Sequence, residues 1–166
     1  GLDNPTVISV WFEKKKGQDY KVLVHSPLTG PHANLLQNSL SKLDIPTWVV
    51  NNDEEMLFEL VRKNLYILTT NIAGLEVGGD VNHLWSNYRE LALKVIDDVL
   101  TIQFHIINQT LDKEKLIEAM VEAINGDLEH KCMGRSAPAR LARALEYADK
   151  YQLHVPELER ISLSSK

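Results

Sequence analysis

Two adjacent polar residues, Lys63 and Asn64, stand in the middle of an otherwise apolar helical pattern and are the first candidates for chemistry. Asn64 lies four residues after Leu60 and four before Leu68, which predicts that its side chain projects from the apolar stripe toward a packing partner. A buried amide costs free energy unless it is hydrogen-bonded. Asn64 is therefore expected either to satisfy a neighbouring backbone group or to line a cavity. Lys63 lies about 100° away around the helix and could edge the same cavity.

A second group of reactive residue types is the segment His130-Lys131-Cys132-Met133-Gly134-Arg135. Neighbouring cations can lower the pKa of a thiol and so favour the nucleophilic thiolate. A cysteine nucleophile also needs an orienting base and a site that stabilises an oxyanion, and the sequence shows neither. We therefore interpret Cys132 as a structural residue.

The sequence carries none of the short motifs that bind dinucleotides, triphosphates, zinc or calcium. Its densest glycine cluster, at residues 74–79, lies between two predicted helices, where a helix end and a turn are expected rather than a phosphate-binding loop. The histidines show no metal-ligand spacing, so no metal site is predicted. They are His25, His32, His83, His105, His130 and His154.

Composition limits the classes of function. The chain has 166 residues, a formal net charge of −5 and a pI of about 5.7, so nucleic acid and anionic membranes are not expected partners. No apolar run reaches the roughly 18–20 residues that a membrane span needs. The single cysteine, Cys132, cannot form an intrachain disulfide, which favours a reducing compartment such as the cytoplasm or an organelle matrix. The run Lys14-Lys15-Lys16 is expected to be a solvated hairpin tip.

The first 50 or so residues are predicted to contain the β structure. Two β-rich runs, 7–12 and 20–25, are separated by a polar connection with Gly17 and predict a hairpin. Pro27, Gly30 and Pro31 indicate a loop, which an amphipathic helix and a short strand at 47–50 then follow. No strand is expected beyond that point.

The remaining residues predict a bundle of four or more helices. Residues 51–55 supply a capping residue and first-turn acids for a helix that should end at Gly74, and one long helix is expected at 83–108. Asp112 is expected to cap a helix at 113–125, and another helix should cover 136–151. A short turn should follow Pro156, with fraying at 162–166. The predicted fold is α+β and mostly helical.

Several segments match one enzyme family in order and spacing. That family reads Trp-x-Lys-Leu-x-x-Asn at the start of one helix, where this chain has Phe58-Glu59-Leu60-Val61-Arg62-Lys63-Asn64. Its Gly-Glu-Leu turn falls on Gly79-Asp80-Val81, its Gly-Arg before a site acid on Gly134-Arg135, and its closing segment on Tyr151-Gln152-Leu153-His154-Val155-Pro156. The chain thus resembles the ketopantoate reductase family of NADP-dependent oxidoreductases, which join a Rossmann domain to a helical domain like that of 6-phosphogluconate dehydrogenase.

The family's catalytic groups are not all present. Leu60 stands where the family has the lysine that donates a proton to the substrate ketone, and Leu68 stands where it has a further asparagine. Leucine has no proton to give. The segment after Arg135, which begins at Ser136, contains no acid in the place of the family's glutamate.

The resemblance implies a domain plan and a function. Residues 1–52 would be the remnant of a Rossmann-type domain, a hairpin and short strand from its sheet, and residues 53–166 the helical C-terminal domain; the chain would then be a C-terminal piece. A full-length parent would use NADP, whereas this chain alone would bind none. Asn64, Lys63, Arg135 and Ser136 would hold a small 2-oxo or hydroxy acid, and the helical part would form a homodimer. The alternative is a non-catalytic binding or dimerisation module that has lost the family chemistry.

Overall fold

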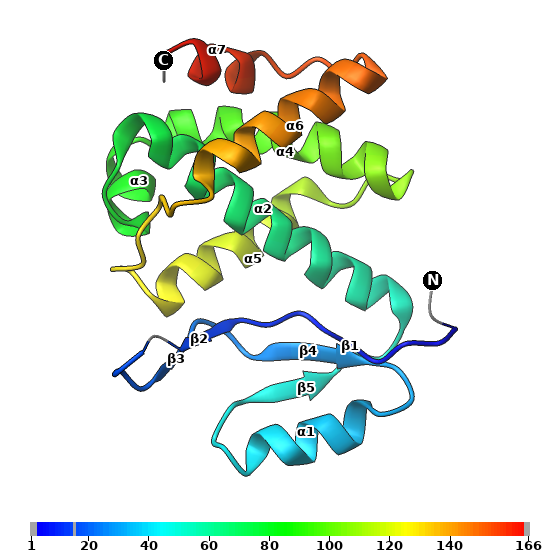
Figure 1. Cartoon of the computed structure of the whole chain (residues 1–166). Helices are drawn as coiled ribbons and strands as arrows, with labels where there is room; N and C mark the ends of the chain where they lie inside the picture. The colour runs from blue at the N-terminus through cyan, green and yellow to red at the C-terminus, as the bar shows by residue number, and fades with distance from the viewer. Residues whose placement is uncertain (1–2, 15, 165–166) are drawn as a thin grey trace. The chain divides into compact units, whose positions relative to one another are not determined.

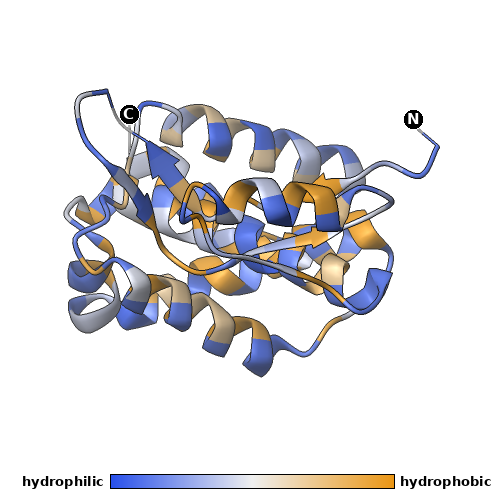
Figure 2. Cartoon of the chain, turned by 90° about the horizontal axis from the view of Figure 1, so that it is seen from below, coloured by the Kyte–Doolittle hydropathy of each residue, from blue (hydrophilic) through white to orange (hydrophobic). Residues whose placement is uncertain are grey.

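The computed structural model describes residues 3–14 and 16–164, whose contacts divide the chain into two units, Gly1–Lys63 and Asn64–Lys166. The first unit holds all the named strands and α1, and the second holds five whole helices and most of α2 (Figure 1). The fold is therefore α+β and mostly helical, as the sequence predicted. The described helices combine hydrophobic and hydrophilic residues along their length (Figure 2), as expected for elements with one buried face.

The first unit contains a sheet with the strand order β1-β4-β5 and a separate hairpin. Strand β4 (Ser26–Thr29) pairs antiparallel with β1 (Val7–Ile8) and parallel with β5 (Thr47–Val49), and α1 (Ala33–Ser41) connects the parallel pair. The hairpin joins β2 (Phe12–Lys14) to β3 (Tyr20–Val22), with Phe12 opposite Val22. Lys14 and Lys16 are exposed near its tip, and Lys15 lies outside the described residues.

The expected loop at Pro27 is instead the central strand of the sheet. The ladder to β5 uses Ser26 and Leu28: Ser26 N donates to Pro46 O (3.2 Å) and Leu28 O accepts from Val50 N (2.9 Å). Pro27 contributes only its carbonyl, which accepts from Ser9 N at 3.0 Å. Because this strand needs no amide from Pro27, the residue that suggested a loop is tolerated there. The run at 7–12 is correspondingly divided between β1 and β2 rather than forming one hairpin strand.

Helix α2 (Asp53–Val77) begins as the sequence predicted and ends later. Asn52 Oδ1 accepts from Glu55 N at 2.8 Å and caps the helix. The expected end at Gly74 is wrong, because the helix continues to Val77 and turns at Gly78 and Gly79, which have φ of +63° and +71°. Gly74 is needed for packing: a Cβ there would lie 2.8 Å from Cys132 Cβ.

The long helix expected at 83–108 is divided into α3 (Val81–Asn87) and α4 (Arg89–Ile107). Tyr88, with φ of −129° and ψ of 36°, breaks the helix although neither proline nor glycine marks the position. The spacing of apolar residues continues from α3 into α4 without interruption, so the periodicity alone did not reveal the break. Asp80 caps α3 by accepting from His83 N at 2.9 Å.

The last three helices are α5 (Lys113–Gly126), α6 (Ala137–Tyr151) and α7 (Pro156–Ser164). Asp112 Oδ1 accepts from Lys115 N at 3.0 Å, which confirms the predicted cap of α5. The short turn expected after Pro156 is a helix that continues to Ser164, so residues 162–164 do not fray as expected, and residues 165 and 166 lie outside the described residues. Helix α4 contacts α3, α6 and α7 and forms the centre of this unit, with Val95, Ile96 and Val99 fully buried.

Candidate functional site

Asn64 lies on an exposed part of α2, so the expectation that it is buried on the apolar stripe is wrong. The fully buried positions of this helix are displaced around it and include Leu65 and Ile72. Asn64 Nδ2 donates to Gln103 Oε1 at 3.0 Å, and Gln103 is itself only 5% exposed. The amide of Asn64 is thus satisfied by a side chain of α4.

The Asn64–Gln103 pair lies in a cleft of about 350 Å³ between α2, α4 and α6. Apolar side chains cover much of its surface, and five polar side chains join them. The apolar residues are Ile67, Leu68, Ile102, Ile106 and Ala144, and the polar ones are Asn64, Gln103, Arg140, Arg143 and Tyr147. We call this site the amide–arginine cleft. Its lining residues include two guanidinium groups and no carboxylate, which favours an anionic ligand.

The two arginines are held differently. Arg140 Nη1 donates to Asn71 Oδ1 at 2.7 Å, whereas Arg143 Nε donates to Ala139 O of its own helix at 3.2 Å. Arg140 is partly buried and Arg143 is exposed. Both guanidinium groups retain further N–H donors that could form paired hydrogen bonds with a carboxylate.

Tyr147 brings a hydroxyl group to the same cleft. Its Oη lies 2.9 Å from His105 Nδ1 of α4, and the two rings meet edge to face with centroids 5.7 Å apart. The ring of Tyr151 lies tilted against both rings, with its centroid 4.6 Å from that of Tyr147 and 4.7 Å from that of His105. This aromatic cluster fixes the position of the Tyr147 ring at one side of the cleft.

Leu68, in place of the family's further asparagine, lines this cleft, but the other positions that the sequence singled out do not. Leu60, in place of the family's lysine, is 37% exposed. Lys63 is partly buried, and burial lowers the pKa of its ammonium group. Arg135 and Ser136 are both exposed and precede α6, outside the lining of the cleft.

The sequence nevertheless contained a signal for the residues it missed. Arg140, Arg143, Ala144 and Tyr147 follow the spacing i, i+3, i+4, i+7, which places them on one face of the predicted helix. The partner Gln103 had no such signal, because its contact with Asn64 joins two different helices.

Cys132 is buried, and burial raises the pKa of its thiol to about 11, with Asp80 adding to the shift and Lys131 opposing it. The lowering by neighbouring cations that the sequence suggested is therefore outweighed by desolvation. Among the described residues, no group of three or more His, Cys, Asp or Glu could hold a metal ion, and no helix is long and apolar enough to cross a bilayer.

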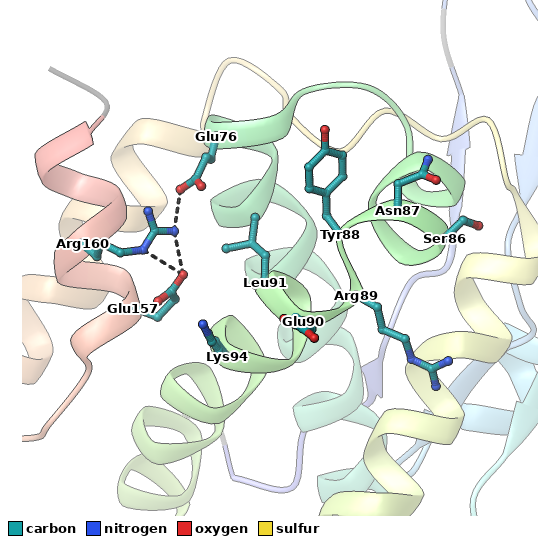
Figure 3. Close-up of a pocket in the computed structure, with 10 residues that line it drawn as sticks. All are labelled: Glu76, Ser86, Asn87, Tyr88, Arg89, Glu90, Leu91, Lys94, Glu157 and Arg160. Carbon is teal, nitrogen blue, oxygen red and sulfur yellow. Dashed lines mark hydrogen bonds and ion pairs between the residues drawn. The ribbon is translucent and has the colours of Figure 1, made fainter.

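A larger pocket, of about 510 Å³, lies beside α3, α4 and α7 (Figure 3). Arg160 Nη2 lies 2.6 Å from Glu76 Oε2 and 2.7 Å from Glu157 Oε1. The hydrogen bond to Glu157 and, to a smaller extent, the one to Glu76 raise the pKa of Arg160. Three acidic and three basic side chains line this larger pocket, and Arg160 is already paired with two of the acids. We therefore take the amide–arginine cleft as the candidate site.

Comparison with known proteins supports the fold. No protein-family model and no curated protein sequence matches the chain. A solved structure, 2-dehydropantoate 2-reductase from Porphyromonas gingivalis W83, superposes with a TM-score of 0.63 at 10% identity, covering 96% of this chain and 53% of that one. The chain has a ketopantoate reductase-like fold. It spans about half the length of that reductase.

Proposed function

We propose that this chain binds a small organic acid in the amide–arginine cleft and forms the substrate-binding side of a ketopantoate reductase-like oxidoreductase. The observation that carries the proposal is that two arginines and the hydrogen-bonded Asn64 and Gln103 amides line one cleft, whose lining residues include no carboxylate. The fold similarity to a 2-dehydropantoate 2-reductase supports an acid of the 2-oxo or 2-hydroxy class.

Each part of such a ligand has a matching group in the cleft. The carboxylate would accept charge-assisted hydrogen bonds from Arg140 and Arg143. The 2-oxo or 2-hydroxy oxygen would meet the amides of Asn64 and Gln103, which retain donor and acceptor capacity after their mutual bond. The ligand's carbon chain would contact apolar residues such as Ile67 and Ile102.

The residues present do not fit the NADP that the resemblance implies for a complete protein. Gly30 is the only glycine between a described strand and a described helix, β4 and α1, but the space beside its Cα is filled by Pro5 O, which a Cβ would approach to 2.3 Å. Gly78 and Gly79 connect two helices. Leu60 supplies no proton, so we propose binding by this chain and assign no reduction step to it.

Isothermal titration calorimetry of the intact chain with 2-oxo-3-methylbutanoate and its 2-hydroxy counterpart tests the proposal. Arg140→Gln and Arg143→Gln should each weaken binding by about 10- to 100-fold, because each removes a charge-assisted interaction with the carboxylate. Arg135→Gln removes the same charge outside the cleft and should leave the affinity unchanged. Equal affinities in wild type and both cleft variants would place the acid elsewhere.

A second candidate is a helical binding or dimerisation module without the family chemistry. It is favoured by Leu60, which replaces the family's proton-donating lysine, and by the segment after Arg135, which has no acid in the place of the family's site glutamate. A wild-type chain that binds no acid in the titration would support this module. The homodimer and the assignment to a reducing compartment stay predictions.

NADPH provides an independent titration. Because no strand-to-helix glycine loop in the described residues is open to a pyrophosphate, we expect no micromolar binding of NADPH to this chain. Calorimetry at the concentrations used for the acids measures this directly. A micromolar dissociation constant would show that the chain carries a dinucleotide site.

A further inference from the structure

We infer that Asn71 is a positioning residue, which holds the guanidinium group of Arg140 in place for the ligand of the amide–arginine cleft. The inference rests on the proposed function and deepens it, because it assigns one arginine a preorganised role and the other an adaptable one. Asn71 lies on α2, outside the residues that line the cleft, and nothing in the sequence pattern distinguished it.

Both ends of the Asn71 amide are engaged, and the residue is only 8% exposed. Asn71 Oδ1 accepts from Arg140 Nη1 at 2.7 Å, while Asn71 Nδ2 donates to Cys132 O at 3.0 Å. A carbonyl can only accept, so the Cys132 contact fixes which end of the amide faces Arg140. The amide therefore presents an oriented acceptor to the guanidinium group.

The backbone that orients Asn71 is itself tightly packed. Cys132 is fully buried, and its N–H donates to Gly79 O at 3.2 Å. The absence of a side chain at Gly74, where a Cβ would lie 2.8 Å from Cys132 Cβ, lets this segment lie close against α2. The position of the Arg140 guanidinium is thus set by a chain of contacts through Asn71 to buried backbone.

The chemistry of the Asn71 acceptor preserves the charge of Arg140. A carboxylate at this position would neutralise the guanidinium group, whereas a neutral amide uses one N–H donor and leaves the positive charge available. Arg143 has no comparable contact with α2: its Nε bonds to Ala139 O of its own helix, and the side chain is exposed. We therefore expect Arg140 to bind the carboxylate at a lower cost in side-chain entropy than Arg143.

A double-mutant cycle separates positioning from a merely structural role. Dissociation constants for 2-oxo-3-methylbutanoate are measured by calorimetry for wild type, Asn71→Ala, Arg140→Gln and the double variant. Asn71→Ala should weaken binding about 2- to 10-fold in the wild-type background, because Arg140 must then be ordered on binding. In the Arg140→Gln background the same change should have no further effect, because its target is gone.

Thermal unfolding of each variant controls for folding, and Asn71→Ser replaces the alanine variant if that protein does not fold. An equal loss of affinity in both backgrounds would indicate a general disturbance of the cleft and would overturn the inference. A loss with Arg140→Gln but none with Asn71→Ala would overturn it while leaving the proposed function intact. A wild-type chain that does not bind the acid would overturn both.

Discussion

Gly30→Ala should lower the free energy of unfolding of the first unit by about 2–5 kcal/mol. Gly30 has a φ of +102°, a conformation that an L side chain rarely adopts. An alanine Cβ would also lie 2.3 Å from Pro5 O and 2.7 Å from Thr6 Cα, and both are backbone atoms. Neither can move without disturbing the residues that lead into β1.

Chemical denaturation followed by tryptophan fluorescence, to which Trp11 and Trp48 of the first unit contribute, measures the effect. Gly17→Ala is a matched control, because Gly17 also has a positive φ, +79°, but a Cβ there would meet no atom within 4 Å. We expect the control to lose only about 1 kcal/mol, the conformational contribution alone. Similar losses in the two variants would mean that the contact with Pro5 is not the cause.

Asp98→Ala should destabilise the helical unit by about 2–4 kcal/mol, because it removes two hydrogen bonds at the start of α7. Asp98 Oδ2 accepts from Glu157 N at 2.7 Å and from Leu158 N at 3.0 Å. Val155, which precedes Pro156, has no side-chain oxygen, so the cap of α7 comes from α4 instead. Asp97→Ala is the control: its exposed ion pair with Lys113 should contribute less than about 1 kcal/mol.

The Asp98 contribution should also depend on pH. Burial raises the pKa of Asp98, and the hydrogen bonds from Leu158 and Glu157 oppose the shift without cancelling it. The folded chain therefore binds this proton more tightly than the unfolded chain. The resulting contribution to the free energy of unfolding is complete below the ordinary carboxyl pKa and is lost as the pH rises through the raised pKa. Asp98→Asn cannot titrate; relative to it, the wild type should gain stability as the pH is lowered through the raised pKa. A difference that does not change with pH would contradict this.

Local sequence patterns predicted the features that depend on neighbouring residues. The caps at Asn52 and Asp112, the helix at 136–151 and the change from strands to helices near residue 53 all rest on local hydrogen bonds or on apolar spacing. The strand at Pro27 was missed because its pairing partners lie far away in the sequence. Gly74 was misread because a tertiary contact with Cys132, rather than a helix end, requires the glycine.

The candidate site was predicted only in part. Asn64 does line a cleft, but its partner Gln103 and the arginines come from two other helices, whose relative placement no single helical pattern specifies. The family resemblance pointed to Arg135, because Gly134-Arg135 matches the family's Gly-Arg in the sequence. The structure places Arg140 and Arg143 in the cleft, five and eight residues further along the chain.

The packing around Cys132 has an experimental consequence. Cys132 is the single cysteine of the chain, its side chain is inaccessible, and its raised pKa leaves little thiolate near neutral pH. An alkylating reagent can therefore reach the sulfur only when the segment between α5 and α6 separates from Gly74 and Asn71. Cys132 is thus an intrinsic reporter. Its alkylation rate measures how often the Cys132 segment, which orients Asn71 toward Arg140, separates from α2, without any added label.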